Sequence, residues 1–216
     1  MTSRHESAAE TQYVPLPRNF FNPSAAIVAP RLLGHILVRP TPEGTMSSLI
    51  VETEAYVIND PACHGYGGES ARNRSMYGPP GHAYVYFIYG VYWCVNAVCR
   101  PKGIAEAVLI RAVEPVAGID LMRERRPVAH DKQLTNGPGK LCTALAIDRG
   151  LDGADLCHAN SPLWLARNPD RKRLLLGKGP MITTTRIGIT RAAHLPLRFY
   201  LSGSAWVSRQ AKGAKR

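Results

Sequence analysis

No run of apolar residues in this 216-residue sequence approaches the roughly 18 residues that a membrane-spanning helix needs. The first 17 residues are polar and lack the apolar segment of a secretory signal peptide. Both absences argue against secretion and against a membrane partner. With 45% hydrophobic residues, the chain is still long enough to bury the core of one globular domain. The sequence therefore predicts a cytoplasmic protein.

The sequence lacks the cysteine spacing that is typical of metal sites. No two of the five cysteines form a Cys-x-x-Cys pair, the spacing common in zinc sites and redox disulfides. Their odd number also argues against a disulfide framework. Most lie in apolar segments, which predicts buried, reduced thiols and no metal site. The five are Cys63, Cys94, Cys99, Cys142 and Cys157.

The local motifs of several common enzyme classes are also missing. The sequence has no P-loop, no Gly-x-Gly-x-x-Gly, no Gly-x-Ser-x-Gly and no His-x-Glu followed by Cys-x-x-Cys. These absences disfavour nucleotide hydrolysis, dinucleotide chemistry, serine hydrolysis and zinc-dependent base deamination. No cofactor is expected.

Acidic residues are few relative to basic ones. Lys and Arg number 27 against 16 Asp and Glu, which gives a formal net charge of +11. Such a surface suits a polyanion, because each neutralised phosphate releases condensed counterions. The charge therefore favours a nucleic-acid partner and association with the nucleoid, whereas a basic protein without such a partner is the alternative.

The order of the expected elements is mixed, which favours an α+β fold. We expect a single domain over residues 19–208, built on a curved, largely antiparallel β-sheet flanked by helices, with a protruding β-hairpin. Residues 1–18 lack periodicity and are expected to be disordered, and residues 209–216 form a basic tail. Apolar, β-prone segments predict strands at 35–39, 48–57, 84–89, 92–98, 107–113, 181–189 and 197–201. Helices are expected at 117–126 and at about 140–147.

Another helix is expected near the N-terminal end of the domain. Asn22 suits its N-cap, Pro23 suits its first position, and Gly34 could close it. Pro30 lies inside this stretch and should kink or shorten the helix. Residues 59–82, by contrast, form a long Gly/Pro/Ser-rich loop, and a loop of that length in a compact domain is usually functional or disordered.

A pair of carboxylates ends one of the predicted strands. Alternation along a strand places Glu52, Glu54 and Tyr56 on one face. Two carboxylates there are costly to bury without partners, so a solvated face, or a pair satisfied by arginines, is the alternative to a catalytic site. Arg111 lies in an apolar strand and needs a buried partner such as Glu54, unless it faces solvent or pairs with Glu114.

Tyrosines mark the predicted hairpin. Tyr89 precedes Gly90 at the expected turn, so it would be presented outward, where an aromatic could fill the gap left by a base that leaves the stack. Tyr84 and Tyr92 have a simpler interpretation as cross-strand packing. In the preceding long loop, His64, Arg72 and Arg74 are candidate phosphate contacts.

Together these segments resemble the alkyladenine (3-methyladenine) DNA glycosylase family. The most telling are the Val-Glu-Thr-Glu-Ala-Tyr sequence at 51–56 and the tyrosine-rich segment at 84–96. The likeness runs from about residue 20 to 208, and the matching segments occur in the family's order. They are 32–34, 50–56, 61–64, 72–74, 84–96, 109–115, 136–142, 186–189 and 196–200.

The resemblance implies a catalytic group. Glu54 matches the family's general base, which activates water, and Arg111 matches the arginine that holds that water. The main-chain carbonyl of Ile187 matches the third contact of the water. The implied activity is removal of a damaged purine from double-stranded DNA by a monomeric, monofunctional glycosylase that leaves an abasic site.

The resemblance also implies binding residues. Tyr56, His64 and Tyr86 match the residues that sandwich the flipped base, and Asn96 matches the side chain that acts against purines with a 2-amino group. Tyr89 matches the residue that enters the minor groove in place of the flipped base. The positions that match contacts to the DNA backbone or groove are Arg72, Arg74, Val91 and Tyr92.

The chain departs from the family pattern in places. Pro30 stands where relatives continue a helix, Val91 is β-branched beside the hairpin tip, and residues 157–180 match poorly and receive no role. Two other functions are considered. A non-catalytic nucleic-acid-binding domain would not need Glu54 with Arg111, and a hydrolase of free nucleosides would need neither the excess charge nor an exposed Tyr89.

Overall fold

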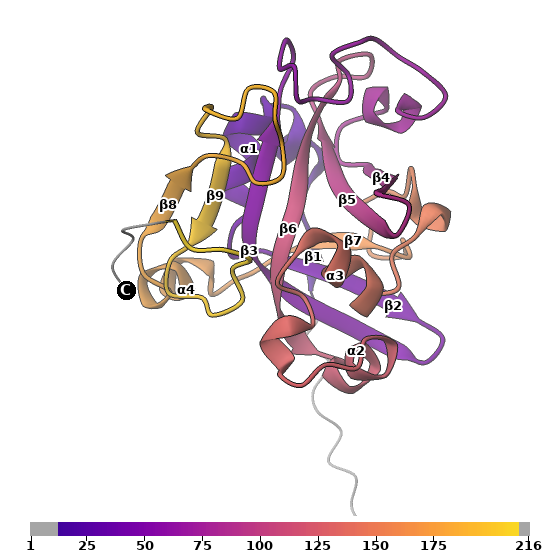
Figure 1. Cartoon of the computed structure of the whole chain (residues 1–216). Coiled ribbons are helices and arrows are strands. Elements are labelled where there is room, and N and C mark those ends of the chain that lie inside the picture. Colours follow the sequence, from indigo (N-terminus) through magenta and orange to yellow (C-terminus); the bar gives the residue numbers. More distant parts are fainter. Residues whose placement is uncertain (1–12, 212–216) are drawn as a thin grey trace, which may run out of the picture.

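The core of the protein is a curved antiparallel β-sheet, seen in a computed structural model that describes residues 13–211 (Figure 1). Its two long central strands are β3 (Gly44–Tyr56) and β6 (Glu106–Ala117), which pair along most of their length. Most of their residues are buried on both faces, including the polar residues from Ser47 to Glu54 on β3. The expected α+β class and antiparallel sheet are confirmed.

The remaining strands extend this centre on both sides. The main path runs β1-β7-β2-β3-β6-β5-β4, while β9 pairs with β3 and β8 pairs with β9. Every pairing is antiparallel. The shorter strands are β1 (Val14–Pro15), β2 (Ile36–Thr41), β4 (Ala83–Ile88), β5 (Tyr92–Cys99), β7 (Trp164–Arg167), β8 (Met181–Thr184) and β9 (Arg198–Leu201).

Irregular register bends the centre of the sheet. The β3–β6 ladder shifts between Ser47 and Ser48 and on both sides of Glu52. An extra residue in one strand increases its twist and bends it. Beyond the irregularity, β9 pairs with residues 52–54 on the other edge of β3. Glu52 and Glu54 therefore lie where β3 is flanked by both β6 and β9.

Within residues 13–211, four α-helices and several 3-10 turns surround the sheet. The helices are α1 (Ala25–Leu32), α2 (Ile119–Arg125), α3 (Pro138–Ala144) and α4 (Arg171–Gly177). The first packs against β3 and β6, and the third packs against β5 and β6. No helix of residues 13–211 is long and apolar enough to cross a membrane.

The first helix differs from expectation at its start. Asn22 lies at the end of a 3-10 turn, and Ser24 is the N-cap residue of α1. Its first turn is capped from outside, because a Glu106 carboxylate oxygen accepts hydrogen bonds from the Ser24 hydroxyl (2.7 Å) and the Ala25 N–H (2.8 Å). The helix ends at Leu32, two residues after Pro30, as expected of a shortened helix.

Some segments with weak patterns are nevertheless structured. The expectation of disorder is wrong for residues 13–18, because β1 pairs with β7 and Leu16 is buried; residues 1–12 lie outside the described part. The region 157–180 contains β7 and α4. The strand expected over 181–189 ends at Thr184, and the chain continues as a loop.

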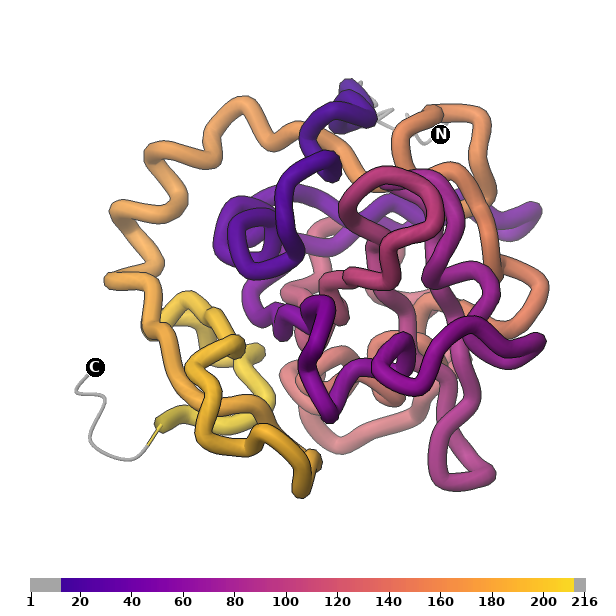
Figure 2. The backbone as a smooth tube through the Cα atoms, turned by 90° about the horizontal axis from the view of Figure 1, so that it is seen from above, coloured from indigo at the N-terminus to yellow at the C-terminus, as the bar shows by residue number. Residues whose placement is uncertain are grey.

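The predicted hairpin is present and protrudes. Strands β4 and β5 pair from Ala83 to Ile88, and Tyr89 and Gly90 form the turn with φ of 55° and 68°. In Figure 2 this magenta hairpin and the orange loop after β8 project on the same side of the molecule. Of the cysteines, four are buried and Cys157 is partly buried, which confirms their interpretation as inward-facing free thiols.

Candidate active site

Two fully buried carboxylates on β3 lie next to the candidate site, in contact with Arg111, which lines it. Arg111 on β6 lies between them, with its Nε 3.1 Å from Glu52 Oε1 and its Nη1 3.3 Å from Glu54 Oε2. The sequence anticipated the pairing of Arg111 with Glu54. Sharing of the same guanidinium with Glu52 was not anticipated, because the bulge and the β9 pairing that create it are long-range features.

Glu52 is the better satisfied of the two carboxylates. Its oxygens accept hydrogen bonds from Arg198 Nε on β9 (2.6 Å) and from the N–H (2.7 Å) and hydroxyl (2.8 Å) of Ser208. Arg198 in turn donates to the carbonyl of Arg209. Arg111 adds an ion-pair contact to these three hydrogen bonds, so Glu52 is a structural acceptor.

Glu54 contacts one guanidinium group, whereas Glu52 contacts two, and this changes the electrostatics of Glu54. Ile187 N–H donates to its Oε1 (2.8 Å), and the Tyr56 hydroxyl donates to its Oε2 (3.1 Å). Burial raises the pKa of Glu54 above its ordinary value, and Arg111 and the Ile187 N–H only partly oppose this rise. A carboxylate of this kind accepts a proton more readily than a solvent-exposed glutamate does.

The position of Ile187 relative to Glu54 agrees with expectation, although a different atom makes the contact. The resemblance assigns the main-chain carbonyl of Ile187 to the catalytic water, whereas the structure gives a hydrogen bond from its N–H to Glu54. The two roles involve different atoms of one residue and are compatible. The role of the carbonyl stays a prediction.

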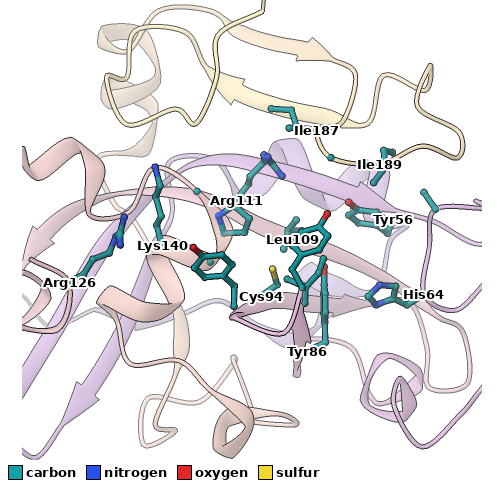
Figure 3. Close-up of a pocket in the computed structure, with 18 residues that line it drawn as sticks. Tyr56, His64, Tyr86, Cys94, Leu109, Arg111, Arg126, Lys140, Ile187 and Ile189 are labelled. Atoms are coloured by element: carbon teal, nitrogen blue, oxygen red, sulfur yellow. The ribbon is translucent and has the colours of Figure 1, made fainter. Parts of the chain in front are cut away.

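A pocket lined by Arg111, Tyr56 and Ile187, the three residues bonded to Glu54, lies next to this carboxylate. Its volume is about 500 Å³, in the range of small-molecule sites. Figure 3 shows Tyr56, Tyr86 and His64 on one side, Lys140 and Arg126 on the other, and Ile187 and Ile189 at a third edge. The predicted base-binding aromatics are therefore brought together by β3, β4 and the loop after β3.

The aromatic wall is held in place by its own contacts. His64 packs edge-on against Tyr86 with 4.4 Å between ring centroids, and its Nδ1 lies 2.9 Å from the Tyr84 hydroxyl. Tyr84 stacks on Tyr86 from behind at 5.3 Å. Burial, followed by the charge of Arg72, lowers the pKa of His64, so this ring is neutral at neutral pH.

Asn96 lies beside the pocket rather than in its main wall. It lines a small adjoining cavity of about 20 Å³ behind Tyr86, and its amide nitrogen donates to the Tyr84 carbonyl (3.0 Å). Tyr56, His64 and Tyr86 line both cavities, and the expected role of Asn96 against purines with a 2-amino group stays a prediction.

The hairpin tip presents its side chains to solvent at the mouth of the pocket. Tyr89 is 75% exposed and has a left-handed backbone, a conformation in which a bulky residue is uncommon. Val91 and Tyr92 beside it are also exposed, and Tyr89 and Tyr92 line the pocket. Gly139 allows α3 to approach, because a Cβ there would lie 2.8 Å from the Tyr92 side chain.

Basic side chains surround this mouth. Arg72 approaches the Phe87 carbonyl of the hairpin (3.4 Å), while Arg74 lies 3.5 Å from Glu69 and is largely exposed. Arg126 and Lys140 line the pocket and form no ion pair among residues 13–211. Sequence reasoning missed Arg126 and Lys140 as site residues, because neither has a distinctive neighbour pattern.

Within the described residues, no three His, Cys, Asp or Glu side chains gather so that they could hold a metal ion. The chemistry that the observed groups can perform is proton transfer by Glu54, supported by Arg111, next to a flat molecule stacked on aromatic rings.

Comparison with known proteins identifies relatives across nearly the whole chain. The family model described as methylpurine-DNA glycosylase matches residues 19–205. A protein of Methanoculleus marisnigri named "Putative 3-methyladenine DNA glycosylase" is 49% identical over 195 residues, covering 90% of this chain and 99% of that protein. Proteins of the same name from Mesorhizobium japonicum and Carboxydothermus hydrogenoformans are 45% and 46% identical, covering 96% and 90% of this chain and 97% and 99% of theirs.

The unequal satisfaction of the two carboxylates predicts opposite effects on stability. Glu52→Gln should lower the free energy of unfolding by about 2 kcal/mol or more, because it leaves buried arginines with a neutral partner. Glu54→Gln should leave the stability unchanged or raise it, because it removes a charge whose burial is only partly compensated. Urea unfolding at pH 7 measures both, and equal losses would contradict the distinction.

Proposed function

Because the chain belongs to the methylpurine-DNA glycosylase family, we propose that its pocket receives a damaged purine flipped out of duplex DNA and that Glu54 activates water against the N-glycosidic bond. The chain is a base-excision-repair DNA glycosylase. The observation that carries the mechanism is the buried Glu54, with its raised pKa, hydrogen-bonded to Tyr56, Arg111 and Ile187, which all line an aromatic pocket.

The proposed reaction is a hydrolysis. A water oxygen attacks C1′ of the flipped nucleotide and its proton passes to Glu54, while the electron pair of the breaking N-glycosidic bond leaves with the purine. The anionic Glu54 also stabilises the positive charge that develops on the sugar. Arg111 keeps Glu54 ionised and is within reach of a water bound between them.

The aromatic wall supports a preference for alkylated purines. A cationic, N-alkylated base is attracted to the faces of Tyr56 and Tyr86 and leaves as a neutral molecule without an added proton. The neutral His64 adds a third ring to this wall without a competing charge. The names of the relatives specify 3-methyladenine, and alkylated, deaminated and etheno purines all belong to the proposed substrate class.

The hairpin supports the flipping step. The exposed Tyr89 has the size and position to fill the gap in the stack, and Val91 and Tyr92 flank it for groove contacts. Arg72 and Arg74 are the proposed backbone contacts, and Arg126 and Lys140 extend this basic rim on the opposite side of the pocket. We propose that the protein acts on DNA as a monomer.

A non-catalytic binding domain is less consistent with the site. Two buried carboxylates that share one arginine impose a desolvation cost that binding alone does not require. A hydrolase of free nucleosides is disfavoured by the exposed Tyr89 and the basic rim.

The central test uses a duplex with a single hypoxanthine or ethenoadenine. Wild-type enzyme should give strand scission only after treatment with alkali, since the proposed enzyme leaves an intact abasic site. Glu54→Gln should bind the duplex and lose at least ~100-fold in single-turnover rate, as expected for loss of a general base. Glu43→Gln, an exposed residue outside the pocket, is the matched control.

Two results would count against the proposal. Full activity of Glu54→Gln would eliminate the general-base role. Scission before alkali would show lyase chemistry, and Lys140, the lysine in the pocket lining, would be the first nucleophile to replace.

The single-turnover rate should depend on pH through Glu54. The base must be ionised to accept a proton, and burial raises its pKa above the ordinary value of 4.5. The rate should therefore fall about tenfold per pH unit on the acidic limb of the profile, and this limb should begin above pH 4.5. A rate profile measured from pH 4 to 8 locates the limb. A limb below pH 4.5 would contradict the assignment.

Replacement of the hairpin tip should separate binding from flipping. Tyr89→Ala should weaken excision more than initial binding of undamaged duplex, because the vacated position in the stack is left empty. Tyr89→Phe keeps the ring and should remain near wild type. Fluorescence of a 2-aminopurine beside the lesion, read together with binding, measures the two steps; equal losses would argue against the wedge role.

A further inference from the structure

A buried ion pair lies immediately behind the active site and has no part in the mechanism above. Arg186 and Asp60 have fully buried side chains, and the guanidinium donates to both carboxylate oxygens, with 3.0 Å from Nη2 to Oδ1. The pair joins two loops that are far apart in sequence, one following β3 and one following β8. Its geometry is bidentate, an arrangement that the planar guanidinium of arginine can form and the ammonium group of lysine cannot.

The same guanidinium contacts three further groups around Glu54. It donates to the carbonyl of Ala55 (3.0 Å) and reaches the carbonyl of Ala192 (3.5 Å) at the far side of its own loop. Its central carbon lies 4.7 Å from the centre of the Tyr56 ring. The side chain is thus held by the Ala55 carbonyl before Tyr56, by the Asp60 carboxylate after it, and by the Ala192 carbonyl of the loop that carries Ile187.

Two residues next to the Arg186 side chain and its backbone contact Glu54 directly. Tyr56 donates from its hydroxyl to Oε2, and Ile187, adjacent to Arg186 in the chain, donates from its N–H to Oε1. The N–H of Ile187 can reach Glu54 only while its loop is held against the end of β3. Within the described residues, Arg186 supplies the side-chain contacts that join this loop to Asp60 and to the Ala55 carbonyl.

We propose that Arg186, oriented by Asp60, is a positioning residue that places the Ile187 N–H and the Tyr56 ring against Glu54. It touches neither substrate nor water and acts through these two residues. This inference rests on the proposed function, because it concerns how the general base is held. A pair with only a structural role could be replaced at similar stability without changing how Glu54 titrates.

The pH readout depends on every charged or titratable group that faces Glu54. These groups come from four parts of the fold: Glu52 and Tyr56 on β3, Cys94 on β5, Arg111 on β6 and the Ile187 N–H from the loop after β8. Arg198 on β9 is bound to Glu52. Replacement of Arg186 leaves all of these residues unchanged but releases the Ile187 N–H from Glu54. Because this N–H favours the ionised form of Glu54, its loss should raise the pKa of Glu54. The limb of the rate profile should therefore move to higher pH.

The experiment compares Arg186→Lys and Asp60→Asn with wild type on the lesion duplex. Lysine keeps a charge but cannot make the bidentate pair, the Ala55 contact and the ring contact together. The single-turnover rate should fall about tenfold or more, as expected for a lost hydrogen bond to a charged group. The low-pH limb should rise by about half a unit or more, and the duplex Kd should stay within about threefold of wild type.

Two further variants test whether the effect comes from the Ile187 N–H or from a general loss of stability. Ile187→Pro removes the same N–H directly and should move the limb in the same direction. Arg18→Lys disrupts another arginine–aspartate pair, with Asp155 at 2.5 Å, away from the pocket, and should leave the limb in place. All rates are measured below the melting temperature of each variant.

Two results would overturn the inference while Glu54-dependent excision stands. One is a limb that does not move in either Arg186→Lys or Asp60→Asn. The other is a rate loss that only follows lost stability, as in Arg18→Lys. Excision by wild type that does not depend on Glu54 would instead overturn the proposed function. The two failures are therefore distinguishable.

Discussion

The structure depends on the burial of two carboxylates beside a single guanidinium at the centre of the sheet. Glu52 and Glu54 have no contact with solvent, and Arg111 contacts both. Such a group tolerates no missing partner, because a buried charge left unpaired costs several kcal/mol. The fold provides the two carboxylates with different sets of partners. Glu52 receives a full set of donors, whereas Glu54 keeps an unfavourable charge that can be used for chemistry.

The segments that complete this arrangement come from distant parts of the chain. Arg198 and Ser208 arrive from the C-terminal region to satisfy Glu52, and the loop after β8 supplies the Ile187 N–H to Glu54. The hairpin and α3 add the aromatic tip and the basic rim. The irregular β3–β6 register makes this convergence possible, since it bends β3 at the point where β9 joins it.

Much of this site could be predicted from local sequence, and the reason is physical. An arginine in an apolar strand requires a buried acid, so the Glu54–Arg111 pair follows from residue type alone. A tyrosine before glycine between two β-prone segments likewise predicts an exposed tip, which Tyr89 confirms. The Arg186–Asp60 pair and the donors to Glu52 could not be found this way, because they join residues more than 120 positions apart and have no periodic pattern. Strands as short as β1 and β7 also give too little alternation to detect.

The hydrogen bonds from Ser208 to Glu52 have a consequence for the synthesis of the protein. The carboxylate is on a central strand that forms from the first quarter of the chain, yet two of its donors are supplied by residue 208 of 216. While the chain is still emerging from the ribosome, the sheet centre carries an acid without its full set of partners. The hydrogen bonds of Glu52 can thus be completed only after Ser208 has been synthesised, so a shorter chain that already contains the hairpin lacks part of the buried network beside the pocket.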